Sequence, residues 1–107
     1  MENNQIEPKF PEQFEEYKLI LEEIYCMHMK KSQDYSAWNV KGVGETGVAV
    51  RIWDKTARLM NLLGWDIATG NLDKPKNPHN ESLDDTLFDL AAYAVIMLVL
   101  RRGKWGK

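Results

Sequence analysis

The segment over residues 81–100, with the sequence ESLDDTLFDLAAYAVIMLVL, constrains the fold more than any other part of this chain. Its second half, from Leu90 to Leu100, is apolar on every side. A helix of that kind is buried all round, and this one is too short to cross a bilayer, which takes about 20 apolar residues. We therefore expect an all-α domain in which other elements surround this helix.

Length and composition describe one soluble domain. The 107 residues are 44% hydrophobic and 28% charged, which is ordinary for a globular protein. With a net charge of −2, the chain lacks the excess of positive charge that is typical of proteins that bind DNA, RNA or an acidic membrane. Cys26 is the single cysteine, and the polar N-terminus lacks the apolar region of a signal peptide, so we expect a cytoplasmic protein.

Apolar periodicity predicts two further helices. The first begins at Pro11, after an N-terminal arm of residues 1–10, and ends near Lys31. The second should run from residue 46 or 47 to Leu63 and stop at Gly64. A glycine-rich loop and a long connection over residues 65–80 join the helices. Residues 11–107 thus form one domain of three main helices. The apolar stripe of the first helix recurs at steps of three and four residues: Phe10, Phe14, Tyr17, Leu21, Ile24 and His28.

The third helix carries carboxylates and no basic residue in its first half. These acids are Glu81, Asp84, Asp85 and Asp89. Ser82 and Asp85 have the spacing of a capping box, which accounts for the acids of the first turn. Asp89 lies two turns further along, between Phe88 and Leu90. An unpaired buried carboxylate there costs several kcal/mol, so we expect a positive group opposite Asp89.

A mixed basic ridge on the second helix is the candidate partner of these acids. It consists of Arg51, Asp54, Lys55 and Arg58. Carboxylates on adjacent helices hold hard divalent cations, with Lys and Arg reaching the phosphates of a bound substrate. The same charges also suit a purely structural network in which the basic side chains neutralise the acids. The residues alone leave both explanations open.

Three segments together carry a resemblance to a known family. They are KSQDY (31–35), DKTARLMNLL (54–63) and ESLDDTLFDLAAYAVI (81–96). The chain resembles the small phage and bacterial nucleotide-modification-associated domains, which are similar to MazG-type all-α nucleoside triphosphate pyrophosphohydrolases. The resemblance covers residues 31–100. It implies a MazG-like helical bundle completed by a homodimer or homotetramer, and hydrolysis of a nucleoside triphosphate to monophosphate and pyrophosphate with Mg²⁺ or Mn²⁺.

The resemblance also implies roles for individual residues. The ExxD motif of the family reads Glu81-x-x-Asp84 here, although the ridge of the helix favours Asp85 as the partner of Glu81. The catalytic acids would be Glu81, Asp85 and Asp89, and these three with Asp54 would hold the metal. The substrate would meet Lys31, Asp34, Tyr35, Trp38, Arg51, Lys55 and Arg58. The chain departs from the wider MazG pattern at its ExxE motif, which reads Arg51-x-x-Asp54 and lacks one acid. Either Glu22 or Glu23 of the first helix replaces that acid, or metal binding is reduced.

Two other functions remain open for this sequence. A protein that has lost the metal would bind and sequester a nucleotide or cyclic nucleotide without hydrolysing it. A purely structural helical oligomer would use the same charges only to pair its helices. Pyrophosphate release and nucleotide binding distinguish these functions from a hydrolase.

Overall fold

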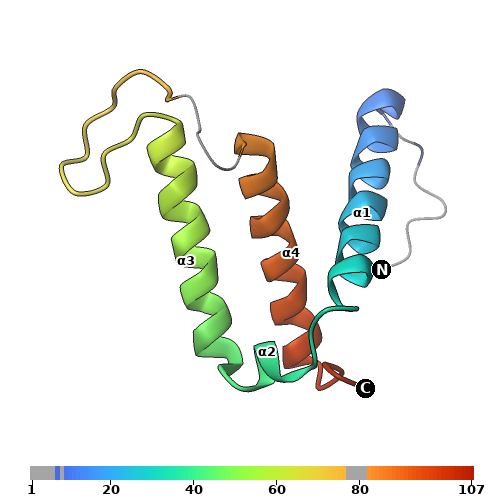
Figure 1. The fold of residues 1–107 in the computed structure, drawn as a ribbon. Coiled ribbons are helices and arrows are strands. Elements are labelled where there is room, and N and C mark those ends of the chain that lie inside the picture. Colours follow the sequence, from blue (N-terminus) through green and yellow to red (C-terminus); the bar gives the residue numbers. More distant parts are fainter. Residues whose placement is uncertain (1–6, 8, 77–81) are drawn as a thin grey trace.

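The computed structural model describes residue 7, residues 9–76 and residues 82–107, and it is all-α in that part of the chain. Four helices follow in order: α1 (Pro11–Lys31), α2 (Trp38–Lys41), α3 (Gly44–Leu62) and α4 (Leu83–Arg101) (Figure 1). Within the same ranges, the single β-type pairing is an antiparallel bridge between Trp65 and Leu72. No helix of the described residues is long and apolar enough to cross a membrane.

The three long helices confirm the predicted ones, with differences at one boundary. Helix α2 was not predicted, and it adds one short turn inside the glycine-rich loop. Helix α3 begins at Gly44, ahead of the predicted start at residue 46 or 47. Gly47 lies inside this helix, where an added Cβ atom would collide with the Val43 side chain. The glycine makes room for this close approach.

Gly64 ends α3 as predicted, through a Schellman motif. Its φ of +95° is in the left-handed region that favours glycine. The Gly64 amide donates to the Asn61 carbonyl at 3.1 Å, and the Trp65 amide donates to the Met60 carbonyl at 2.8 Å. The backbone of Asp73 crosses so closely that a Cβ on Gly64 would lie 2.3 Å from its carbonyl oxygen. This glycine therefore connects the end of α3 to the long connection that follows.

Gly64→Ala is expected to destabilise the protein by about 3 kcal/mol, since the left-handed conformation costs ~1–2 kcal/mol and the collision with Asp73 adds to it. Urea denaturation followed by circular dichroism measures the loss. The matched control is Gly70→Ala, because Gly70 has a φ of +75° and a Cβ there meets nothing within 4 Å. Equal losses in the two variants would show that the Asp73 backbone moves away without cost.

The helices lie side by side in a thin layer, with α3 against α4 and α1 on the other side of α4 (Figure 1). The described chain measures 43 × 42 × 22 Å, and its radius of gyration is 16.6 Å. A compact domain of this length has a radius of gyration of about 13 Å. The chain exposes 8949 Å², whereas a compact monomer of its mass exposes about 6,100 Å². One copy therefore leaves much of its helical surface uncovered.

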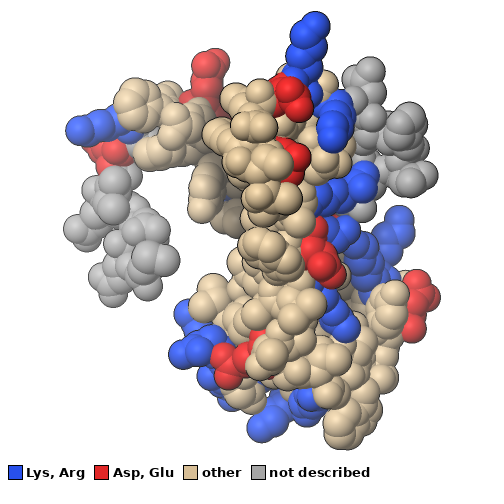
Figure 2. All heavy atoms as spheres, turned by 90° about the vertical axis from the view of Figure 1, so that its left-hand side faces the viewer, with Lys and Arg blue, Asp and Glu red and all other residues tan. Residues whose placement is uncertain are grey.

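The core of a single copy is small. Among the described residues, the fully buried side chains are Val40, Val48 and Thr86. The sequence predicted that this helix is buried all round, and that prediction is wrong for α4 in the single chain. Leu87, Val95 and Leu98 remain about half exposed. The reason is that α1 approaches α4 only with its last turns, while every residue from 11 to 23 is exposed. The face of the molecule seen in Figure 2 is largely uncharged. Many of its Lys and Arg side chains lie along the right-hand side with Asp and Glu among them, and others lie at the left and at the lower end.

Candidate functional site

Asp89 is the point at which the three long helices meet. Its carboxylate, on α4, accepts from Lys55 Nζ of α3 at 2.8 Å. Lys31 Nζ, at the end of α1, lies 3.5 Å from the other carboxylate oxygen. The Asp89 and Lys55 side chains are 21% and 22% exposed, so this ion pair is largely shielded from water. The positive group expected opposite Asp89 is therefore present, and the prediction is confirmed.

The two lysines keep Asp89 ionised. Partial burial raises the pKa of Asp89, but the hydrogen bond and the charge of Lys55, together with those of Lys31, outweigh it. The net result is a pKa below the ordinary value for an aspartate. At neutral pH the group is thus a hydrogen-bond acceptor with a full negative charge, suited to hold a cation or orient a water molecule and unsuited to donate a proton.

The first turn of α4 is organised by a capping box, as predicted. The Asp85 amide donates to Ser82 Oγ at 3.0 Å, and the Ser82 amide donates to Asp85 Oδ2 at 3.4 Å. Behind the cap, the fully buried Thr86 hydroxyl donates to the Ser82 carbonyl at 3.2 Å. Arg58 Nε of α3 donates to the same hydroxyl at 3.2 Å. Asp85 and Arg58 therefore both stabilise the start of α4 where it meets α3.

The predicted metal ligands do not all come together in the described residues. Asp54 lies exposed on α3, and Glu81 lies outside the described residues. Within the described ranges, no group of three His, Cys, Asp or Glu side chains is placed to hold a metal ion. The Asp89 oxygens face lysines, and one oxygen of Asp85 accepts from the cap. Since Glu81 lies outside the described residues, the metal site stays a prediction.

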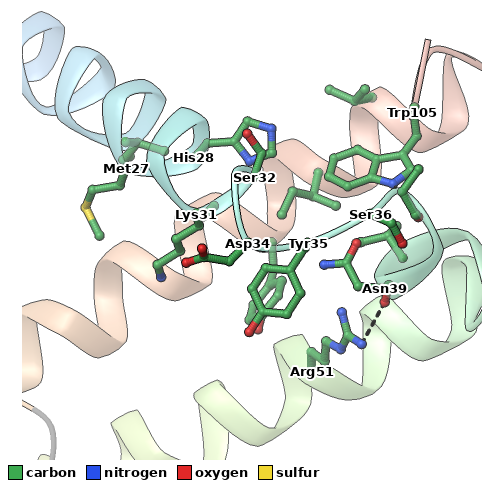
Figure 3. Close-up of a pocket in the computed structure, with 18 of the residues that line it drawn as sticks. Met27, His28, Lys31, Ser32, Asp34, Tyr35, Ser36, Asn39, Arg51 and Trp105 are labelled. Atoms are coloured by element: carbon green, nitrogen blue, oxygen red, sulfur yellow. Dashed lines mark hydrogen bonds between the residues drawn. The ribbon is translucent and has the colours of Figure 1, made fainter.

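A pocket of about 690 Å³ lies next to Asp89. Its walls are the end of α1, the linker of residues 32–37, α2, Arg51 of α3, one side of α4 and the tail of residues 104–107 (Figure 3). This volume is in the range of sites for small ligands. Of the predicted substrate and catalytic residues, the pocket gathers Lys31, Asp34, Tyr35, Arg51 and Asp89. Lys55 and Arg58 are not among the lining residues, and Trp38, 72% exposed, does not line it either.

The pocket combines positive charge with aromatic surface. Its cationic side chains are Lys31, Arg51, Lys104 and Lys107, against the two acids Asp34 and Asp89. The aromatic lining consists of Tyr35, Phe88, Tyr93, Trp105 and His28. An excess of positive charge in a chain of net charge −2 favours an anionic ligand. The aromatic rings offer faces on which a planar group can stack.

Arg51 is held in place from the side of α2. One of its guanidinium nitrogens donates to the Asn39 carbonyl at 2.9 Å, drawn as a dashed line in Figure 3. The side-chain oxygen of Asn39 is buried and has no hydrogen-bond partner in the described part of the chain. A fixed guanidinium with further donors is well suited to an anionic group. Arg51 is thus held at the pocket by its hydrogen bond to α2, a contact that the predicted basic ridge did not include.

Sequence reasoning missed the contribution of the C-terminal tail. Lys104, Trp105 and Lys107 were not predicted to take part in a site. The structure brings all three into the pocket wall, while Arg101 pairs with Glu45 of α3 at 2.8 Å. A tryptophan two residues after Gly103, just past the end of α4, was the available signal, because such a bulky ring packs back on the fold.

Comparisons of this chain with known proteins identify no relative. No protein-family model matches the chain, and no curated protein or solved structure matches it either.

Proposed function

We propose that this protein binds a nucleoside triphosphate in the pocket beside Asp89 and hydrolyses it to a monophosphate and pyrophosphate, using Mg²⁺ or Mn²⁺. The observation that carries the proposal is the composition of the pocket, in which cations and aromatic rings surround a cavity that ends at an ionised carboxylate. The cations suit the phosphates of a nucleotide, and the aromatic rings suit stacking on its nucleobase. The carboxylate suits the orientation of an attacking water molecule. The resemblance to MazG-like enzymes supports the same reaction.

The residues suggest how charge would be redistributed when the ligand binds. Lys31 and Arg51 would contact the phosphates, and Tyr35 would stack on the base. A triphosphate would compete for the ammonium group of Lys31, which lines the pocket and lies 3.5 Å from one carboxylate oxygen of Asp89. Asp89 would then be free to accept a hydrogen bond from the water that attacks the phosphoryl chain.

A nucleotide-sequestering protein is the second candidate. Two of the predicted catalytic acids already have other partners, which favours this function. Asp85 belongs to the capping box, and Asp89 pairs with lysines. A chain with this arrangement would keep the cationic and aromatic pocket and have no group to activate water. It would bind a nucleotide and release it unchanged.

The proposed assembly is a homodimer or homotetramer in which another copy covers α1 and α4. The apolar stripe of α1 supports this, because its C-terminal part, at Ile24 and His28, lines the pocket while Phe14, Tyr17 and Leu21 remain exposed. The surface in excess of a compact monomer, about 2,800 Å², is more than one partner contributes to a standard interface, about 800 Å². A second copy of the same stripe fits a two-fold interface.

We expect pyrophosphate release from at least one of the four dNTPs, and only when Mn²⁺ or Mg²⁺ is present. A coupled pyrophosphate assay measures turnover, and calorimetry with each dNTP measures binding. Arg51→Gln should weaken binding about tenfold, because a hydrogen bond to a charged group contributes ~1.5–3 kcal/mol. Arg102→Gln, an equal charge change on an exposed residue outside the pocket, is the control. Binding without turnover would indicate sequestration, and no binding would indicate a structural oligomer.

A further inference from the structure

Trp105 joins three segments that are distant in the sequence. Its indole N–H donates to the Ala37 carbonyl at 2.9 Å, which ties the tail to the linker of residues 32–37. Its ring also packs against His28 of α1, with ring centroids 5.6 Å apart and planes inclined at 52°. Figure 3 shows the indole beside His28, above the linker. The tail, the linker and α1 are therefore connected through a single side chain.

The linker has few other ties to the bundle. The amides of Ser32, Gln33 and Asp34 donate to carbonyls in the last turn of α1, and Ser36 Oγ accepts from the Trp38 amide. These bonds are local in sequence. Across the described ranges, the hydrogen bond from Trp105 is the one that connects residues 33–37 to a distant element. Yet these residues include Asp34 and Tyr35, both of which line the pocket.

Gly106 lets the tail approach the linker closely. A Cβ atom on this residue would lie 2.7 Å from the Ala37 Cβ and 3.3 Å from the Lys41 side chain. Its φ of +77° also favours glycine. The tail backbone thus rests directly on Ala37, next to the hydrogen bond from Trp105. Two adjacent tail residues hold the same point of the linker.

We infer that Trp105 is a positioning residue of the pocket, which fixes the linker so that Asp34 and Tyr35 face the cavity. The part of this inference that concerns ligand binding rests on the proposed function. The part that concerns the linker stands on the ligand-free structure. Trp105 acts through Ala37, and the ligand meets the residues that the linker carries.

Amide hydrogen exchange in the ligand-free protein tests the tie to the linker. Trp105→Phe keeps an aromatic ring and removes the N–H donor, so exchange of the hydrogen-bonded linker amides of Gln33 and Asp34 should become about fivefold faster. That factor corresponds to ~1 kcal/mol for one neutral hydrogen bond. Trp53→Phe is the matched control, because Trp53 is 59% exposed on α3 and does not line the pocket. Unchanged exchange in Trp105→Phe would overturn the inference.

Gly106→Ala tests the same contact without changing an aromatic residue, should Trp105→Phe fail to fold. It should accelerate linker exchange, whereas Gly70→Ala, with a similar φ of +75° and open space around it, should not. In calorimetry with the dNTP that binds most tightly to the wild type, both Trp105→Phe and Gly106→Ala should weaken binding three- to tenfold. Faster exchange with unchanged affinity would overturn the positioning role. If the wild type binds no dNTP, the proposed function fails and the exchange data alone decide whether Trp105 holds the linker.

Discussion

Asp89→Asn is expected to lower metal-dependent turnover at least a hundredfold, the usual range for removing an acid–base group, while the chain remains folded. Asparagine has the same shape and still accepts one hydrogen bond from Lys55, but it cannot replace the charge. We expect a loss of about 2 kcal/mol in the free energy of unfolding, because a hydrogen bond to a charged group is lost. Steady-state pyrophosphate release and urea denaturation measure the two effects.

The free energy of unfolding, measured as the pH is lowered, separates the effect of the negative charge of Asp89 from that of its side-chain shape. The pKa of Asp89 is lowered in the folded state by Lys55 and Lys31, against the effect of burial. Its contribution to stability is therefore fully present above the unfolded-state pKa of about 4 and is lost as the pH falls through the lower pKa of the folded state. Asp89→Asn should lack this acid-dependent loss. Asp73→Asn, an exposed change in the long connection, should retain both the loss and the turnover.

Two outcomes would contradict the role of Asp89 in catalysis. Unchanged turnover in Asp89→Asn would remove the residue from the reaction. Unfolding of the variant at neutral pH would favour the purely structural network, in which the carboxylate serves only to join α1, α3 and α4.

Leu21→Glu is expected to weaken the proposed assembly by about a hundredfold in dissociation constant. Burying one leucine contributes ~1.5–3 kcal/mol, and a charge in its place adds a desolvation cost. Leu21 is 48% exposed in the single copy and lies on the apolar stripe of α1. Sedimentation equilibrium over a range of concentrations measures the dissociation constant of the wild type and of the variant.

Leu19→Glu provides the matched control for this experiment. Leu19 is 44% exposed on the same helix, and two residues of α-helix turn its side chain about 200° away from Leu21. The two variants change hydrophobicity, charge and helix propensity equally. A monomeric wild type, or equal weakening by both variants, would contradict an interface through the apolar stripe.

The sequence predicted the parts of the structure that depend on neighbouring residues. Periodicity located the three long helices, and the spacing of Ser82 and Asp85 predicted the capping box. It also predicted that Asp89 needs a positive partner, although it did not select Lys55 and Lys31 from the available cations. That choice depends on how three helices pack, which no local pattern contains.

The pocket was less predictable because its walls come from both ends of the chain. Lys31, Asp34, Tyr35 and Arg51 were expected near a ligand and do line it, but Trp105 approaches them from 68 residues beyond Ala37. Trp38 was expected to close over the ligand and instead points outward, because α2 begins there and turns it away from the cavity. The type of a residue indicated what it could bind, whereas the side to which its side chain points depends on the tertiary structure.

The two lysines of Asp89 respond differently to ionic strength. Lys31 is 61% exposed and 3.5 Å from the carboxylate, so dissolved ions screen its attraction. Lys55 is 22% exposed and 2.8 Å away, and its pairing is screened much less. Since Lys31 ends α1 and Lys55 belongs to α3, rising salt weakens the electrostatic tie of α1 to α4 before it weakens that of α3. The bundle is thus divided into a salt-resistant pair of helices and a third helix whose attachment depends on the solution around it.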